Sequence, residues 1–263
     1  MELVIQPDAE SAARLVASLI AKALREKPHL VLGLATGRTM ERVYKHLVRM
    51  HREQGLDFSL CRTFNLDEYI GLRPDHPGSY RYYMDQNLFN HINIDHRNTF
   101  LPDGMATDMK ASCVRYEETI LEFGGIDLQL LGIGADGHIG FNESLSALRS
   151  RTRDKALAPS TIAVNSTLFT NPADMPKRAI TMGVGTILDA RTIILLVTGS
   201  TKAEIVAKAV EGPITSMVSA SALQLHPKCR VVVDEHAAVK LEAQDYYRWI
   251  FETEPEWAEF RDK

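Results

Sequence analysis

A short apolar segment that runs directly into a glycine-rich, charged loop constrains this sequence more than any other feature. Residues 126–133 read IDLQLLGI and are mostly apolar, Gln129 apart, which is typical of a buried parallel strand. The loop that follows contains Gly132, Gly134, Asp136, Gly137, His138, Gly140 and Glu143. Glycines at this density let a backbone turn sharply and approach a ligand closely. A strand followed by such a loop, with two acids and a histidine, predicts a site for proton-transfer chemistry in an α/β protein.

Three interpretations of this loop compete. The glycine spacing at 132–137 formally matches a dinucleotide fingerprint, but the Asp136 carboxylate would repel a pyrophosphate and a polar, basic stretch follows. Asp, His and Glu are all metal ligands, but no second histidine lies at a ligand spacing, so we expect no metal. In the third interpretation, Asp136 and Glu143 hold the imidazole of His138 in one tautomer and raise its pKa, which makes it a proton shuttle near neutral pH. The residues favour this relay.

A second strand-to-helix junction lies near the start of the chain. Residues 29–34 read HLVLGL and predict a buried strand, the small-residue loop ATGRT follows at 35–39, and a helical stretch covers about 40–53. This arrangement presents backbone N–H groups and the positive end of a helix to an anion. The loop lacks the Gly-Lys-Ser/Thr of a Walker A motif. A plain turn between strand and helix is the alternative to a phosphate site.

Charged groups follow two further predicted strands. Asp67 and Glu68 come after a strand expected at 58–65, where a carboxylate is well placed for proton transfer, although a helix or turn cap is the commoner role. Lys202 lies in the first turn of a helix expected at about 201–210. A lysine at the positive end of a helix dipole favours a bound anion nearby, and an exposed lysine at small cost is the alternative.

Strands alternate with helices along the chain, which predicts an α/β fold. We expect a mostly parallel, Rossmann-like open sheet with helices on both faces, in a single domain over residues 1–263. Residues 156–177 carry several Thr, Ser, Asn and Pro and little periodicity, so we expect a mobile flap over the site at about 156–183. The cluster RSRTRDK at 149–155 is either a solvated surface or a site for a small anion.

The composition excludes several classes of protein. The 263 residues carry 30 basic and 34 acidic side chains, so a formal net charge of −4 gives no drive toward nucleic acid or an anionic membrane. The cysteines, Cys61, Cys113 and Cys229, are odd in number and widely spaced, which favours a reducing compartment over a disulfide frame. We see no signal peptide and no apolar run long enough to span a membrane, and we expect a cytoplasmic protein.

Six segments of the chain together resemble the glucosamine-6-phosphate deaminase family. They are FNLDEYIGL (64–72), GIGADGHIGFNE (132–143), SRTR (150–153), MGVGTILDA (182–190), LVTGSTKA (196–203) and LQLHPK (223–228). The similarity is collinear over essentially the full chain, and the DEY and DGHIxFNE blocks are specific. The resemblance implies hydrolysis of glucosamine 6-phosphate to fructose 6-phosphate and ammonia, without a cofactor. The same fold resembles that of 6-phosphogluconolactonases and of the effector domains of sugar-phosphate-responsive repressors.

The resemblance also implies a role for each site residue. His138 would open the pyranose ring by moving a proton between the ring oxygen and the anomeric hydroxyl, with Asp136 and Glu143 orienting and tuning its imidazole. Asp67 would act as the general base that takes the proton from C2 of the open-chain aldehyde and delivers one to C1. The phosphate would be held by Thr36, Gly37, Arg38, Thr39 and Lys202.

Two positions depart from the family pattern around the phosphate. Family members usually have a small residue where this chain has Arg38, and Thr167 stands where a flap arginine binds phosphate in the deaminases. Losing a charge-assisted contact weakens phosphate binding by roughly 1.5–3 kcal/mol. Our hypothesis is that Arg38 supplies the missing guanidinium from the other side of the site. A changed substrate is the alternative.

Further expectations follow from the resemblance. Ser146, Arg153 and Lys155 match positions that bind N-acetylglucosamine 6-phosphate in allosterically regulated hexamers, so they form a candidate anion site, although SRTR has a structural explanation as well. We expect a homo-oligomer, with a hexamer as one form.

The alternatives to this deaminase are a galactosamine-6-phosphate deaminase, a 6-phosphogluconolactonase, which does not need the C2 base, and a non-catalytic sugar-phosphate sensor, which would tolerate loss of the acids.

Overall fold

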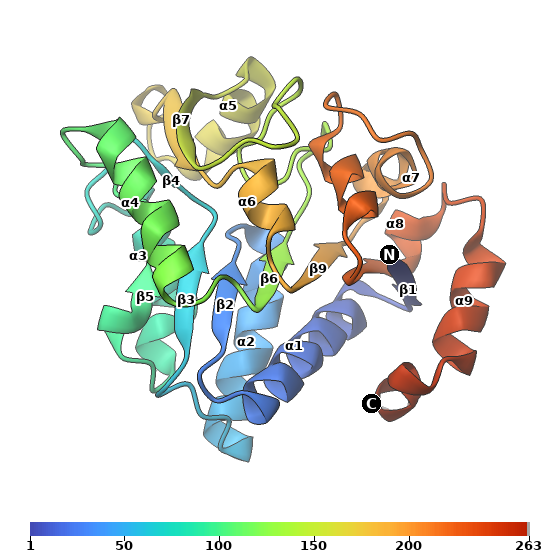
Figure 1. Cartoon of the computed structure of the whole chain (residues 1–263). Helices are drawn as coiled ribbons and strands as arrows, with labels where there is room; N and C mark the ends of the chain where they lie inside the picture. The colour runs from blue at the N-terminus through green and yellow to red at the C-terminus, as the bar shows by residue number, and fades with distance from the viewer. Residues whose placement is uncertain (262–263) are drawn as a thin grey trace.

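Seven parallel strands form the main sheet of the computed structural model, which describes residues 1–261 apart from the side chain of Leu168 (Figure 1). Their spatial order is β1 (Glu2–Gln6), β10 (Cys229–Asp234), β9 (Thr192–Val197), β6 (Leu128–Leu131), β2 (Val31–Leu34), β3 (Arg62–Asn65) and β5 (Thr99–Phe100). Each neighbouring pair is parallel. Residues 193–197 and 231–233 are at most 2% exposed, so these strands are buried on both faces. The predicted mostly parallel sheet is confirmed.

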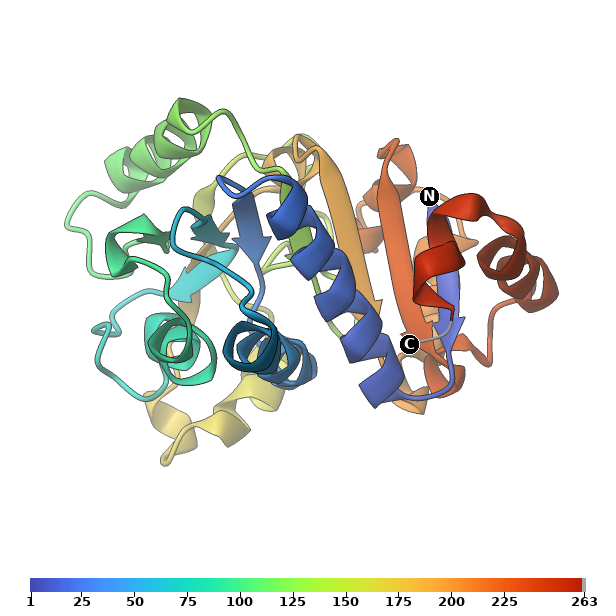
Figure 2. The same ribbon diagram turned by 90° about the horizontal axis from the view of Figure 1, so that it is seen from below.

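Helices cover both faces of this sheet. In Figure 2, α1 and α2 lie on one side of the strands and α4 lies on the other. The helices are α1 (Ala9–Glu26), α2 (Arg38–Gln54), α3 (Tyr80–Asn87), α4 (Met109–Glu122), α5 (Pro159–Asn165), α6 (Val184–Leu188), α7 (Ala203–Val210), α8 (Glu235–Ala238) and α9 (Gln244–Thr253). None of the helices within residues 1–261 is long and apolar enough to cross a membrane.

The longest helix, α1, shows how the sequence sets these elements. The Asp8 carboxylate accepts a hydrogen bond of 2.7 Å from the N–H of Ser11 and so caps the first turn. Leu15, Leu19 and other apolar residues at helical spacing are buried against the sheet and α2. The helix ends at Glu26, two residues before a proline that cannot continue it.

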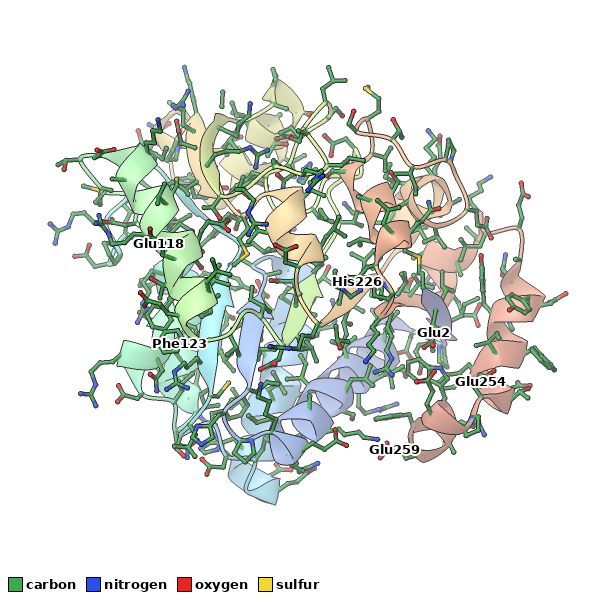
Figure 3. All side chains as sticks on the ribbon, viewed as in Figure 1. Glu2, Glu118, Phe123, His226, Glu254 and Glu259 are labelled. Atoms are coloured by element: carbon green, nitrogen blue, oxygen red, sulfur yellow. The ribbon has the colours of Figure 1, made fainter. Side chains whose placement is uncertain are left out.

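The end of the chain packs against the first strand. α9 contacts β1, and the 3₁₀ turn Pro255–Phe260 follows it. Figure 3 labels Glu254 and Glu259 in this segment and Glu2 on the adjacent β1. Trp257 is fully buried there, and Arg230 of β10 donates to Glu256 at 2.9 Å. The terminal segment therefore covers the edge of the sheet at β1.

A small antiparallel sheet, which the sequence did not predict, lies beside the main one. It contains β4 (Asp67–Tyr69), β8 (Arg178–Thr181) and β7 (Arg153–Ala156) in that order. Asp67 therefore begins a new strand that only Leu66 separates from β3, and part of the basic cluster is β7. β4 has three residues and β7 reads RDKA, so neither shows the alternation of apolar residues that marks a strand.

The strand order places the two candidate sites side by side. From β2 the sheet continues through β3 and β5 in one direction, and from β6 through β9 and β10 in the other. β2 and β6 are neighbours, so the order reverses between them. Loops that leave the carboxyl ends of strands diverge at such a switch point and leave a crevice for a ligand. The loop after β2 and the glycine-rich loop after β6 meet there.

Candidate active site

A cavity of about 530 Å³ lies at this switch point. It is lined by the loop after β2, by β4, by the loop after β6, by α5 and by residues around α3. The sequence-predicted residues among the lining are Thr36, Gly37, Arg38, Thr39, Asp67, Asp136, His138 and Lys202. Glu143 lies behind His138. The fold thus assembles an anion-binding type of loop and two acid–base groups around one space.

The imidazole of His138 contacts two carboxylates through one of its nitrogens. Its Nδ1 atom is 2.5 Å from Oδ1 of Asp136 and 3.3 Å from Oε2 of Glu143. The ring lies against Gly134, where a Cβ atom would come within 2.3 Å of the imidazole, so only glycine leaves room for it. Because both acids contact Nδ1, Nε2 is the nitrogen that is free to act in the cavity.

The two carboxylates set the charge of this group. Burial disfavours a charged imidazole, but the contacts with Asp136 and Glu143 outweigh burial and raise the pKa of His138 to about 9. The hydrogen bond with His138 lowers the pKa of Asp136. Burial opposes ionisation of Glu143, but hydrogen bonds from His138 and Thr161 lower its pKa. At neutral pH the relay is an imidazolium flanked by two carboxylates.

The same three side chains also form a candidate cation group. The ligand atoms of Asp136, His138 and Glu143 lie within 4.8 Å of one another. Two ligands of one tetrahedral zinc ion stand roughly 3.3 Å apart, given metal–ligand bonds of about 2 Å. The separation of 2.5 Å between Nδ1 and Asp136 Oδ1 is shorter than this, as expected for an ion pair in direct contact. The geometry therefore favours the proton relay over the metal interpretation.

Asp67 is the second acid–base group of the cavity. Its side chain is buried, and no hydrogen bond to its carboxylate is found within residues 1–261. Burial, with a further contribution from the charge of Glu68, raises the pKa of Asp67 to about 8, against the opposing effect of His138. A carboxyl group with this pKa gains and loses a proton near neutral pH, as a general base must.

The neighbouring Glu68 has a structural role. Its carboxylate accepts hydrogen bonds from Ser79 Oγ at 2.8 Å and from the N–H groups of Tyr80 and Arg81 at 3.0 and 2.9 Å, at the start of α3. Because side chains alternate along a strand, Asp67 lines the cavity while Glu68 caps the helix. The cap interpretation weighed for this acidic pair thus applies to Glu68.

The loop after β2 has the features of an anion site. Gly37 has a φ of 119°, which side chains rarely allow, and it begins α2 without a side-chain cap. Phenols hold two of the loop carbonyls: Tyr44 donates to the carbonyl of Ala35, and Tyr83 donates to that of Gly37 at 2.8 Å. The N–H groups at the start of the 17-residue helix α2 have no side-chain acceptor and can receive an anion.

Two cations lie around this loop. Arg38 is the first residue of α2, is exposed, and lines the cavity. Lys202 lies in the 3₁₀ turn Ser200–Lys202 immediately before α7, not in the first turn of that helix as predicted, and its Nζ donates to the carbonyl of Ile133 at 2.9 Å. Burial lowers the pKa of Lys202, and the charge of Asp136 opposes this. Thr167 is exposed and lies outside the cavity lining.

The segment 156–183, called the flap segment below, is more regular than its sequence suggested. It contains α5, the 3₁₀ turns Ser166–Leu168 and Pro172–Asp174, and β8. Ser160, Thr161, Val164 and Asn165 of α5 line the cavity. Glu143 Oε1 accepts the N–H of Ala158 at 3.1 Å, which ties the start of α5 to the relay. Tyr69, Tyr80 and Asn165 also line the cavity and were not predicted as site residues, although the two-residue spacing from Asp67 within DEY pointed to Tyr69.

One residue of the basic cluster, Arg151, forms ion pairs with acids of two other segments. Arg151 Nη2 lies 2.6 Å from Glu117 of α4, and its Nη1 lies 2.5 Å from Asp189. Glu117 also accepts hydrogen bonds from the backbone of Thr152 at 2.7 Å and from the hydroxyl of Thr186 at 2.6 Å. These contacts join α4, β7 and α6, so SRTR has a structural function.

The candidate anion residues of this region lie apart from the cavity lining. Ser146 is buried, Arg153 is half-buried and donates to Asn142 Oδ1 at 2.8 Å, and Lys155 is exposed. Asn142 in turn donates to the carbonyls of Ile139 and Met182. Arg153 is therefore connected to the glycine-rich loop through one amide side chain.

Curated proteins are similar to this chain along nearly its whole length. A curated glucosamine-6-phosphate deaminase of Arthrobacter sp. (strain FB24) is 49% identical over 257 residues, which cover 98% of this chain and 99% of the relative. A curated glucosamine-6-phosphate deaminase of Hahella chejuensis (strain KCTC 2396) is 51% identical over 250 residues, which cover 95% of each protein.

Solved structures agree in fold. A structure described as a monomeric glucosamine-6-phosphate deaminase superimposes with a TM-score of 0.90 at 42% identity, covering 91% of this chain and 100% of that one. A 6-phosphogluconolactonase from Trypanosoma cruzi has a TM-score of 0.73 at 19% identity, covering 92% and 97%, and shares the fold. A profile of the family "Glucosamine-6-phosphate isomerases/6-phosphogluconolactonase" matches residues 7–233. The chain belongs to this family of glucosamine-6-phosphate isomerases and 6-phosphogluconolactonases.

Proposed function

We propose that this chain converts glucosamine 6-phosphate and water into fructose 6-phosphate and ammonia. The observation that carries the proposal is that an imidazolium at His138, a carboxyl group of high pKa at Asp67 and an anion-binding type of loop at 35–39 surround one cavity. The reaction needs one group for ring opening, one base for C2 and one site for the phosphate. The curated relatives named above carry the name of this deaminase.

Ring opening is the first step. Nε2 of His138 donates its proton to the ring oxygen as the bond between C1 and that oxygen breaks, and the anomeric hydroxyl loses its proton. The neutral imidazole takes up the proton that the anomeric hydroxyl loses, and His138 is again an imidazolium. Asp136 and Glu143 hold the ring and stabilise its charged form throughout.

Isomerisation is the second step. Asp67 in its carboxylate form takes the proton from C2 of the open-chain aldehyde, and the electron pair forms a C1–C2 double bond while the imidazolium of His138 gives a proton to the C1 oxygen. His138 regains this proton when water adds to C2 in the last step. Asp67 then delivers a proton to C1, which leaves an imine at C2. Water adds to this imine, and ammonia leaves as the ketone forms.

The phosphate anchors the substrate during both steps. We propose that it is bound by Thr36, Gly37, Arg38, Thr39 and Lys202. Arg38 replaces the guanidinium that the flap position lacks: it lines the cavity, whereas Thr167 lies outside the lining and donates its hydroxyl to the carbonyl of Val164 at 2.8 Å. Binding at this loop also uses the uncapped N-terminus of α2.

A coupled product assay tests this function. Purified protein is incubated with glucosamine 6-phosphate while ammonia and fructose 6-phosphate are followed together. We expect equimolar release, which Asp67→Asn abolishes without unfolding the protein. Turnover of galactosamine 6-phosphate or of a sugar-phosphate lactone in place of glucosamine 6-phosphate would contradict the proposal. A lactonase needs no base at C2, so loss of activity in Asp67→Asn separates the two reactions.

The remaining expectations from the sequence stay predictions. Ser146, Arg153 and Lys155 are proposed to bind a sugar-phosphate effector, which activity assays with added N-acetylglucosamine 6-phosphate test. A homo-oligomer is expected, although one structural relative is described as monomeric, and light scattering decides. The flap segment is expected to move over the cavity, and the enzyme is expected to be cytoplasmic.

A further inference from the structure

Tyr69 is a buried residue in the wall of the cavity, two positions along β4 from the proposed general base Asp67. Tyr69 and Asp67 project from the same face of β4, because side chains alternate along a strand, and both line the cavity. Tyr69 is 1% exposed, and its ring packs among Tyr80, Phe141 and Phe169 at centroid distances of 4.9, 5.6 and 5.9 Å. These ring contacts fix the position of the phenol, which has no role in the reaction steps proposed above.

The hydrogen bonds at this phenol run in one direction. Asn165 Nδ2 donates to the Tyr69 oxygen at 3.0 Å, and the Tyr80 hydroxyl donates to it at 3.3 Å. Burial raises the pKa of the Tyr80 phenol, and the hydroxyl of Thr36, which interacts with this phenol, lowers it by a smaller amount. Two donors therefore occupy the Tyr69 oxygen as an acceptor.

The proton of Tyr69 itself is not engaged. Within residues 1–261, the hydrogen bonds at this oxygen are the two that it accepts. Burial raises the pKa of Tyr69 to about 12, so the phenol keeps its proton at neutral pH. A buried donor without an acceptor is unfavourable. The cavity is the side from which an acceptor can arrive.

We propose that Tyr69 is a substrate-binding residue that donates its phenolic proton to an oxygen of the bound sugar phosphate, and that Asn165 orients it. This inference rests on the proposed function and adds a contact to it. The Tyr80 hydroxyl donates to the Tyr69 oxygen, and accepting this hydrogen bond makes the Tyr69 hydroxyl a stronger donor. Asn165 belongs to α5, so the orientation of the phenol depends on the flap segment.

Steady-state kinetics with glucosamine 6-phosphate test the proposal. Tyr69→Phe keeps the ring and removes the donor, and we expect kcat/KM to fall by about 10-fold to 100-fold, as for one lost hydrogen bond to a polar or charged oxygen. Asn165→Ala leaves the phenol without its orienting donor, and we expect a smaller fall. The double variant should be no worse than Tyr69→Phe, because Asn165 acts through Tyr69. Additive losses would contradict that positioning role.

Two matched controls separate these effects from general damage. Tyr82→Phe removes a phenol hydroxyl from α3 outside the cavity lining, and Ser166→Ala removes the hydroxyl next to Asn165, which bonds to the carbonyl of Ala163. Both should keep the kinetics of the unsubstituted protein. If Tyr69→Phe also keeps them, the proposal is wrong. If Tyr69→Phe fails to fold, an unchanged kcat/KM in Asn165→Ala overturns the orienting role.

Two further measurements identify which substrate oxygen accepts the Tyr69 proton and test Tyr69 even if the protein shows no turnover. Inorganic phosphate is used as an inhibitor: weaker inhibition of Tyr69→Phe assigns the contact to the phosphate, and unchanged inhibition with a raised KM assigns it to a sugar hydroxyl. Absence of turnover by the unsubstituted protein would contradict the proposed function. Calorimetric binding of glucosamine 6-phosphate would then decide for Tyr69, since an equal Kd for Tyr69→Phe, or no binding at all, overturns its role.

Discussion

Nδ1 of His138 lies 2.5 Å from Oδ1 of Asp136, and this contact fixes both the orientation and the charge of the imidazole. It leaves Nε2 free in the cavity and, with Glu143, raises the pKa of His138 to about 9. Asp67 faces the same cavity with a pKa raised to about 8 by burial. At the same pH, His138 therefore acts as a proton donor and Asp67 as a proton acceptor.

The pH profile of kcat/KM follows from these two groups. The active form needs Asp67 as a carboxylate and His138 as an imidazolium, so activity rises as the pH passes about 8 and falls as it passes about 9. We expect a narrow bell with an alkaline maximum, measured over pH 6–10 with glucosamine 6-phosphate. A profile that is already flat at pH 6 would contradict the raised pKa of Asp67.

Asp136→Asn removes the charge that stabilises the imidazolium. We expect the pKa of His138 to fall, so the alkaline limb moves to lower pH, and kcat to fall by about 100-fold or more because ring opening loses its oriented proton donor. The measurement is the full pH profile of the variant. Asp174→Asn, in an exposed turn of the flap segment, is the control. An alkaline limb that stays in place would rule out this role for Asp136.

Gly134→Ala tests the close approach of the loop to the imidazole. The new methyl group would lie within 2.5 Å of three atoms of the His138 ring, so the ring or the loop must move. We expect loss of most of the activity with a folded protein. Gly132→Ala meets only the flexible end of Met40, at 3.3 Å, and should cost much less. Equal activities in the two variants would show that the ring does not depend on this space.

Arg38→Ala tests the source of the phosphate guanidinium. We expect KM for the sugar phosphate to rise by about 10-fold to 100-fold, as for one lost charge-assisted contact, with a smaller change in kcat. Arg42→Ala removes the same charge one turn later on α2, outside the cavity lining, and should leave KM unchanged. An unchanged KM in Arg38→Ala would sink the hypothesis. If Arg38→Ala does raise KM, Thr167→Arg in the same background should not lower it again, because position 167 lies outside the cavity lining.

Glu117→Gln tests the structural function of SRTR. The glutamate accepts hydrogen bonds from Arg151, Thr152 and Thr186, so we expect a loss of about 2 kcal/mol in the free energy of unfolding at pH 7. Urea denaturation measures it, and Glu118→Gln on the exposed side of α4, labelled in Figure 3, is the matched control. Equal stabilities of the two variants would exclude a structural role.

The dependence of the free energy of unfolding on pH, at acidic pH, provides a second test of Glu117. Burial opposes its ionisation, but hydrogen bonds from Thr152 and Thr186 lower its folded-state pKa below the ordinary 4.5. Its stabilising contribution is therefore present above that ordinary value and is lost as the pH falls through the folded pKa. Glu117→Gln should flatten this part of the stability curve, and an unchanged curve would contradict the assignment.

The sequence predicted the parts of the site that local chain geometry controls. Asp136, His138 and Glu143 lie within eight positions of one another, and glycines force the loop between them to turn back, so their proximity follows from the backbone. Strand, small-residue loop and helix around residue 37 similarly predict an anion site without knowledge of the fold. Alternation of apolar strands with helices predicted the parallel sheet, because buried strands require helices on both faces.

Contacts between distant segments were decided only by the tertiary structure. Asn165 meets Tyr69 across 96 positions of sequence, and Glu117 meets Thr186 across 69, and no local pattern pairs them. The small sheet was also hidden, since its strands β4 and β7 are too short or too polar to carry an alternating signal. The sequence by itself determined the chemistry of the relay, whose groups are held by short loops. The packing of distant elements decided that Asp67, and not Glu68, faces the cavity, and that the hydroxyl proton of Tyr69 has no acceptor within residues 1–261.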